Sequence, residues 1–159
     1  YPGGPHLDKL AETGDASHFS FPEPKPGGYQ FSFSGLKTSV LYFLRDRLKE
    51  DPDFLENRKA DVAASVRELI VHYLLKKAFK AAKEHEIEHL AVVGGVSANR
   101  LLRRELKAKG KQRKVKTYVP PFEFCTDNAA MIGIVGWQLY KAGHFSAHDV
   151  RPFPAGSEA

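Results

Sequence analysis

Gly94, Gly95 and Ser97 lie in a turn between a short apolar stretch and a basic segment with helical spacing. The two glycines allow the backbone to turn tightly or to lie close to a ligand. Ser97 is expected to cap a helix that runs to Gly110, and free N–H groups at a helix N-terminus favour an anion such as phosphate. The spacing matches neither G-x-G-x-x-G nor the P-loop, so an ordinary turn in which the glycines only ease packing stays open.

Asp127 is a second candidate, because it lies at the expected start of the last helix. Its carboxylate could cap that helix or bind a metal. The turns that follow parallel strands in α/β sheets commonly share one ligand crevice. If Gly94, Gly95 and Asp127 occupy adjacent turns, a phosphate and a metal would meet between them.

The segment from His85 to His89 matches the zinc-protease pattern H-E-x-x-H. That chemistry requires both imidazoles on one face of a continuous helix, one turn apart. Here a long helix is expected to end and a strand to begin between the two histidines, so we predict no zinc site. His144 and His148 follow the expected end of the last helix and are predicted to lie on the surface.

The segment between Asn99 and Thr117 holds nine basic residues and one acidic residue, in a chain whose net charge is +5. Such a cluster suits a phosphate backbone, although a solvated helix face is the common alternative. No aromatic residue is interleaved before Tyr118, which argues against stacking on single strands. The candidate RNA-binding residues are Arg100, Arg103, Arg104, Lys107, Lys111, Arg113 and Lys114.

The composition is that of a water-soluble globular protein, with 42% hydrophobic and 27% charged residues among 159. No apolar run approaches the ~20 residues of a membrane span, and no signal-peptide pattern opens the chain, so no membrane association is expected. Cys125 is the only cysteine, which excludes an intrachain disulfide and favours a reducing compartment, the cytoplasm. The chain starts at Tyr1 and not at Met, as a piece of a longer protein would.

The hydrophobic pattern predicts strands that alternate with helices, and therefore an α/β layered fold. Residues 1–28 hold five prolines and are expected to form a connector with one short helix at 6–13. Strands are predicted at 29–34, at 90–93, where both faces should be buried, and at 115–119; helices are predicted at 36–51, 58–84, 97–110 and from Thr126 or Asp127 to 142. Ala129, Gly133 and Gly136 share one side of the last helix, where they would permit close backbone contact with a neighbour.

Three motifs together carry a family resemblance: Phe31–Thr38, Val93–Asn99 and Phe124–Ile132. They resemble the bacterial TsaD family of tRNA threonylcarbamoyltransferases, formerly called O-sialoglycoprotein endopeptidase or glycoprotease. Tyr1–Pro5 and Val150–Pro152 also resemble family segments. The resemblance implies a two-lobed fold of the actin-like ATPase and sugar-kinase type. The chain would be one fragment of it, the C-terminal half, with a connector at 1–28 and an α/β lobe at 29–159.

The resemblance also implies an activity and a site. In the family, a threonylcarbamoyl group moves from threonylcarbamoyl-AMP to the adenosine next to the anticodon, with TsaB and TsaE as partners. Asn99, with Gly94 and Gly95 beside it, would contact the adenylate, and Asp127 would bind the active-site metal, iron or zinc. The family's H-x-x-x-H metal pair belongs to the N-terminal half, which this sequence lacks, so the chain alone is expected to be inactive. A metallopeptidase, a sugar kinase and a non-catalytic RNA-binding fragment are the alternatives.

Overall fold

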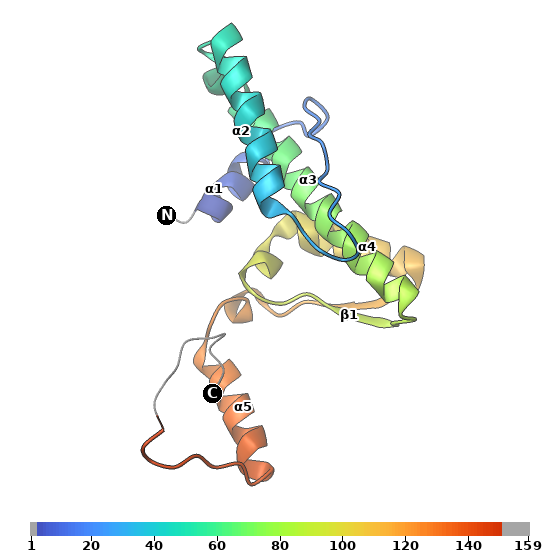
Figure 1. The fold of residues 1–159 in the computed structure, drawn as a ribbon, viewed down its shortest axis with the longest axis vertical. Helices are drawn as coiled ribbons and strands as arrows, with labels where there is room; N and C mark the ends of the chain where they lie inside the picture. The colour runs from blue at the N-terminus through green and yellow to red at the C-terminus, as the bar shows by residue number, and fades with distance from the viewer. Residues whose placement is uncertain (1–2, 151–159) are drawn as a thin grey trace. The chain divides into compact units, whose positions relative to one another are not determined.

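The computed structural model describes residues 3–150, which divide into two compact units (Figure 1). The first unit reaches to Cys125 and the second begins at Thr126. None of the helices described is long and apolar enough to cross a membrane.

Three helices open the first unit: α1 (Gly3–Leu10), α2 (Phe33–Glu50) and α3 (Phe54–Glu84). The predicted helix at 6–13 is present but begins and ends three residues earlier. Helix α2 ends before Pro52, as predicted, because a residue that precedes proline is disfavoured in the helical conformation. Helix α3 begins four residues before its predicted start and ends at the predicted residue, Glu84.

The predicted strand at residues 29–34 is wrong, because residues 29–32 form a loop and residues 33–34 already belong to α2. Ser32 is the N-cap of α2, and its hydroxyl accepts a hydrogen bond from the Gly35 N–H. Phe31 and Phe33 both pack edge-on against the ring of Tyr73, whose hydroxyl accepts a hydrogen bond from the Ser32 N–H. The alternation of aromatic residues therefore reflects packing on one side chain of α3 and not a sheet.

A β–α–β segment follows, made of β1 (His89–Ala91), α4 (Arg100–Arg113) and β2 (Lys116–Tyr118). The two strands pair in parallel, with Leu90 opposite Thr117. Both strands and the helix were predicted, but the strands are shorter than expected, and α4 starts and ends three residues later. The prediction that the first strand is buried on both faces is wrong, since His89 and Ala91 are exposed and only Leu90 faces the core.

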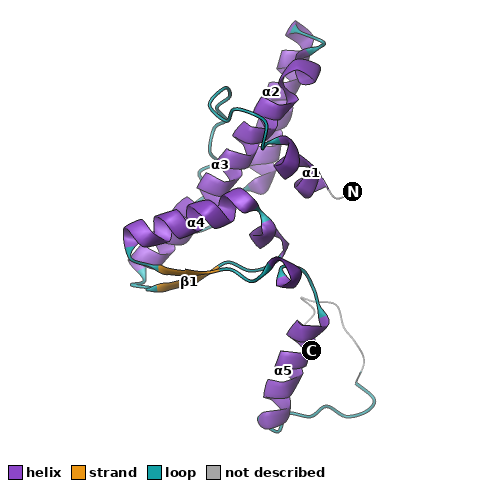
Figure 2. Ribbon diagram, turned by 180° about the vertical axis from the view of Figure 1, so that it is seen from behind, coloured by secondary structure: helices purple, strands orange, loops and turns teal. Residues whose placement is uncertain are grey.

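The main core lies where α3 and α4 cover one face of this small sheet (Figure 2). Gly110 brings α4 close to β2, because a Cβ at this position would lie 2.5 Å from the Thr117 methyl carbon. The buried core residues are Val71, Leu75, Phe79, Leu101, Leu102 and Leu106, and Leu90, Val92, Val115 and Val119 pack against them. Two helices and two strands thus hold the turn between β1 and α4 in place.

The second unit begins at Thr126, and its one described helix is α5 (Ala129–Lys141). The helix ends as predicted near Gly143, whose φ of 73° lies in the left-handed region that glycine favours. None of its residues is buried, and Ile132 is 75% exposed. The predicted close backbone contact is not found among the described residues, since a Cβ at Gly133 or Gly136 would meet no atom within 4 Å.

Candidate functional site

The turn between β1 and α4 has a backbone conformation that only glycine adopts easily. Gly94 has φ 83° and ψ 177° and precedes a short 3-10 helix, Gly95–Ala98. Gly94 and Gly95 are exposed, and a Cβ on either would meet no described atom within 4 Å. The backbone here is therefore open to approach by a ligand.

Ser97 stabilises the turn through a buried hydrogen bond and does not cap the helix. Its side chain is fully buried, and its hydroxyl donates a 2.7 Å hydrogen bond to the Gly94 carbonyl oxygen. The Ser97 N–H donates to the same oxygen at 2.9 Å. The prediction that Ser97 caps the helix is wrong, because this paired contact holds its hydroxyl inside the turn.

Asn99 is the residue that caps α4. Its Oδ1 accepts a 2.8 Å hydrogen bond from the Leu102 N–H, and its Nδ2 donates a 2.9 Å hydrogen bond to Oδ1 of Asp8 in α1. The amide group of asparagine has two N–H donors, and Asp8 takes one of them. The orientation of the Asn99 side chain is therefore fixed at both ends, and its second amide N–H donates to none of the described residues.

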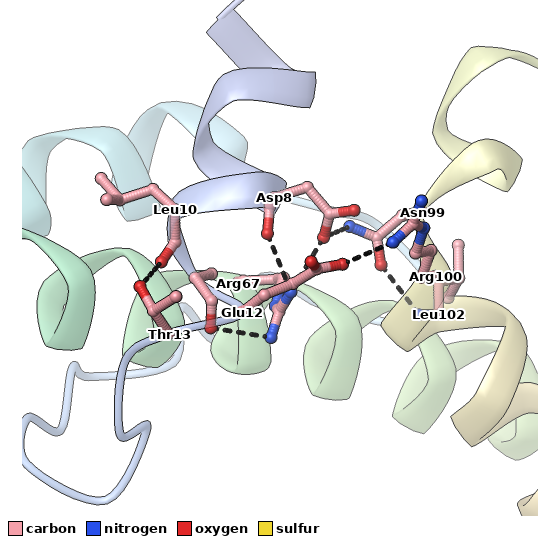
Figure 3. A network of polar contacts seen from close by, with 9 residues as sticks. Asp8, Leu10, Glu12, Thr13, Arg67, Asn99, Arg100 and Leu102 are labelled. Atoms are coloured by element: carbon pink, nitrogen blue, oxygen red, sulfur yellow. Dashed lines mark hydrogen bonds and ion pairs between the residues drawn. The ribbon is translucent and has the colours of Figure 1, made fainter.

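Asp8 and Arg67 anchor this arrangement to the rest of the unit (Figure 3). Arg67, on α3, donates 3.0 and 3.1 Å hydrogen bonds to the backbone oxygen and Oδ1 of Asp8, and a further one to the Ala11 carbonyl oxygen. The side chains of Arg67 and Asp8 are only 15% and 18% exposed. A second pair, Arg100 with Glu12 at 2.8 Å, joins the first residue of α4 to the turn after α1 on the surface.

Asp8 is not among the residues predicted from the sequence, and it lies 91 residues before its partner Asn99. No local pattern links two such positions, because the contact depends on α1 packing against α3 beside the start of α4. The one short-range signal is the four-residue spacing of Asp8 and Glu12, which would place two carboxylates one turn apart if the helix continued beyond Leu10. That spacing alone does not say which basic or polar residues they meet.

Asp127 lies before α5 in the second unit, and it does not cap that helix. The cap is Asn128, whose Oδ1 accepts a 3.1 Å hydrogen bond from the Met131 N–H. The prediction that Thr126 or Asp127 opens the helix is therefore wrong by one or two residues. The Asp127 side chain is exposed, and the capping role that was its alternative function belongs to its neighbour.

The described residues contain no group of three or more His, Cys, Asp and Glu side chains that could hold a metal ion. A catalytic transition-metal site typically takes about three ligands from the protein. These residues therefore do not fit a metal by themselves, and Asp127 could supply at most one ligand. That Gly94, Gly95 and Asp127 occupy adjacent turns stays a prediction.

Comparison with known families now identifies the chain's relatives. The family described as "TsaD: tRNA N6-adenosine threonylcarbamoyltransferase" matches residues 1–134. The chain belongs to the TsaD family. This family has the actin-like ATPase fold, as the resemblance implied, and the mixed helices and parallel strands of the structure agree with it.

Relatives of this TsaD chain carry the name tRNA N6-adenosine threonylcarbamoyltransferase. A protein of Porphyromonas gingivalis is 47% identical over 153 residues, which are 96% of this chain and 45% of the relative. A protein of Phocaeicola vulgatus is 50% identical over 149 residues, 94% of this chain and 44% of the relative. A protein of Thermosipho africanus is 46% identical over 156 residues, 97% and 46% respectively. The chain thus spans less than half the length of these relatives.

The histidine pair of this TsaD chain does not form a zinc-protease motif. His85 is the C-cap of α3 and His89 begins β1, as predicted, so the two imidazoles are not on one helix. The His89 Nδ1 lies 2.9 Å from the Tyr118 hydroxyl.

His85 lies 3.1 Å from the Tyr29 hydroxyl, which donates a hydrogen bond to Glu84. That hydrogen bond lowers the pKa of Glu84 and raises the pKa of Tyr29. His144 and His148 are exposed, as predicted.

The basic residues of this TsaD chain's α4 divide into two groups. The Arg103 guanidinium points inward: it donates hydrogen bonds to the Ser97 and Pro120 carbonyl oxygens and to the Cys125 sulfur, and it stacks on Phe122 at 4.0 Å. Arg113 lies over the ring of Phe79. Arg113 is nevertheless exposed, as are the other candidate residues, Arg100, Arg104, Lys107, Lys111 and Lys114.

Proposed function

We propose that this chain is the C-terminal part of a tRNA threonylcarbamoyltransferase. The whole protein would move a threonylcarbamoyl group from threonylcarbamoyl-AMP to the adenosine next to the anticodon. The observation that carries the proposal is the turn Gly94–Asn99, which lies inside the matched region and has an open glycine backbone beside a fixed asparagine amide. The names of the relatives support the same activity.

In this proposal the turn binds the nucleotide. Gly94 and Gly95 let the adenylate approach the backbone, since neither has a side chain and neither is covered. Asn99 directs its remaining N–H toward the nucleotide, while Asp8 and the Leu102 N–H hold its amide in one orientation. Fixing the donor before the ligand arrives reduces the entropy lost on binding.

Asp127 would contribute one carboxylate ligand to the family's metal, iron or zinc. Its exposed side chain and the capping of α5 by Asn128 support this role, because the carboxylate is not needed by its own helix. The other ligands would come from the part of the relatives that this chain does not span. TsaB and TsaE as partners, and a cytoplasmic location, stay predictions from the family resemblance.

The proposal is tested in a full-length protein of this family that contains the chain. Asp127→Ala should lower the bound metal and abolish threonylcarbamoyl transfer to tRNA, with the circular dichroism spectrum unchanged. Asn99→Ala should raise the KM for threonylcarbamoyl-AMP. Asp53→Ala is the matched control, because Asp53 is exposed and its side chain makes no capping hydrogen bond. Full transfer and full metal content in Asp127→Ala would overturn the proposed role of Asp127.

A further inference from the structure

We infer that the exposed basic side of α4 binds the phosphate backbone of the RNA substrate. This inference rests on the proposed function, which makes tRNA the substrate. The residues concerned are Arg100, Arg104, Lys107 and Lys111, called the α4 stripe below. An α-helix turns by about 100° per residue, so these four positions fall within an arc of about 60°.

The α4 stripe is held in a fixed direction by the opposite side of the helix. Leu102, Leu106 and Gly110 are buried against α3 and the two strands. A Cβ on Gly110 would collide with Thr117 and with the Val115 carbonyl oxygen, which shows how tightly this end of α4 is packed. The helix therefore cannot rotate about its axis without breaking the core, and the stripe faces solvent.

Few acidic groups neutralise the α4 stripe. Arg104 is 74% exposed and its one described ion pair is with Glu105, at 3.6 Å, which also pairs with Lys109. Among the residues that the structure describes, Lys107 and Lys111 make no ion pair within 4.0 Å. Only Arg100 at the start of the helix meets a separate acid, Glu12. A row of positive charge about 16 Å long remains, from position 100 to position 111.

The arrangement favours a phosphate backbone over a membrane surface. A helix that binds a membrane inserts its apolar face between lipids, and here that face is already buried in the core. A nucleic acid instead presents a row of phosphates, which attract lysine and arginine whatever the base sequence. The stripe matches that requirement, because it offers repeated cations and no aromatic side chain for reading bases.

Not every basic residue of α4 belongs to this surface. Arg103 donates to the Ser97 and Pro120 carbonyl oxygens and is therefore a structural residue of the turn. Arg113 is exposed, but its guanidinium lies over the Phe79 ring and its position falls outside the arc of the α4 stripe. The contacts thus divide the seven candidate RNA-binding residues into groups whose replacement should have different effects on stability and on RNA binding. Replacing Arg103 should destabilise the turn, whereas replacing the stripe should not.

The test measures the binding of an unmodified tRNA transcript to a full-length protein of the family as a function of salt. The stripe variant carries Arg104→Gln, Lys107→Gln and Lys111→Gln. Losing three phosphate contacts should weaken binding by about a hundredfold at 0.1 M monovalent salt and reduce the slope of log K against log salt by about 2 to 3. In turnover, the KM for tRNA should rise while kcat at saturating tRNA stays near that of the wild type.

The control variant carries Arg45→Gln, Lys49→Gln and Lys59→Gln, which remove the same charge from exposed positions on α2 and α3. It should keep the wild-type salt slope. An unchanged slope in the stripe variant, or an equal loss in the control, would overturn the assignment of the α4 stripe. If the wild-type protein binds tRNA but transfers nothing to it, the proposed function is contradicted. The effect of the stripe variant on tRNA binding would still test the assignment of the α4 stripe.

Discussion

The turn Gly94–Asn99 and the start of α5 differ in how far this chain stabilises them. In the first, Ser97 is fully buried and Asn99 is bonded to both Leu102 and Asp8. In the second, Asn128 caps its helix locally, whereas Asp127 and most of α5 are exposed. The turn proposed to bind the nucleotide is thus preformed within this chain, whereas the residue proposed as a metal ligand lies beside a helix that the described residues do not cover.

The two regions should differ most in the stability lost when one apolar side chain in each is shortened to alanine. Leu106→Ala should lower the free energy of unfolding of the 159-residue chain by about 3 kcal/mol, because Leu106 is buried in the core formed by α3, α4 and the two strands. Ile132→Ala on α5 should change it by less than about 0.5 kcal/mol, since Ile132 is exposed. Urea unfolding followed by circular dichroism measures both. Equal losses would show that the two regions are packed alike.

The glycine turn can be tested by a neighbouring pair of substitutions. Gly94→Ala should destabilise the chain by about 1–3 kcal/mol, because φ 83° with ψ 177° is a conformation essentially restricted to glycine. Gly95→Ala is the control, as its φ is not positive and a Cβ there meets no described atom. Thermal unfolding compares the two. If both variants are equally stable, the turn is less rigid than the structure indicates.

The anchor of Asn99 can be separated from the surface pair beside it. Asp8→Ala should cost about 2 kcal/mol, because it leaves the poorly exposed Arg67 without its carboxylate and Asn99 without an acceptor. Glu12→Ala should cost less than about 1 kcal/mol, since Arg100 and Glu12 are 72% and 43% exposed. Chemical denaturation measures the difference. A larger loss of stability in Glu12→Ala than in Asp8→Ala would contradict the assignment of Asp8 as the anchor of Asn99.

A smaller effect should appear in the acid stability of the first unit. Hydrogen bonds from the Asp15 N–H and then from Arg58 hold the pKa of Asp61 below its ordinary value. A carboxylate with a lowered folded pKa stabilises the fold above its unfolded pKa of about 4, and this stabilisation is lost as the pH falls further. Asp61→Asn should therefore make the urea midpoint less dependent on pH between 5 and 3. An unaltered pH dependence would contradict this account.

The sequence predicted the order of the central elements well, because long periodic stretches and helix-breaking residues are local signals. It failed where a local pattern had two physical explanations. The alternation of Phe31 and Phe33 resembled a strand but arises from packing on Tyr73. Ser97 and Asn99 are both good caps, and only the burial of Ser97 decides between them.

The candidate site was predictable only in part. Glycines in a turn and a motif resemblance identified Gly94, Gly95 and Asn99, which the structure places in one turn. The contact with Asp8 joins residues 91 positions apart and follows from helix packing that no local pattern encodes. The inward direction of Arg103 could not be read from its charge, because its partners are carbonyl oxygens of the backbone.

The central claim is that this chain supplies a preformed nucleotide turn and only one metal ligand of a larger site. It is tested most directly by assaying threonylcarbamoyl transfer to tRNA, with TsaB and TsaE present, by the 159-residue chain and by a full-length protein that contains it. We predict transfer by the full-length protein, and no transfer and only weak adenylate binding by the chain alone. Transfer by the 159-residue chain alone would contradict the account.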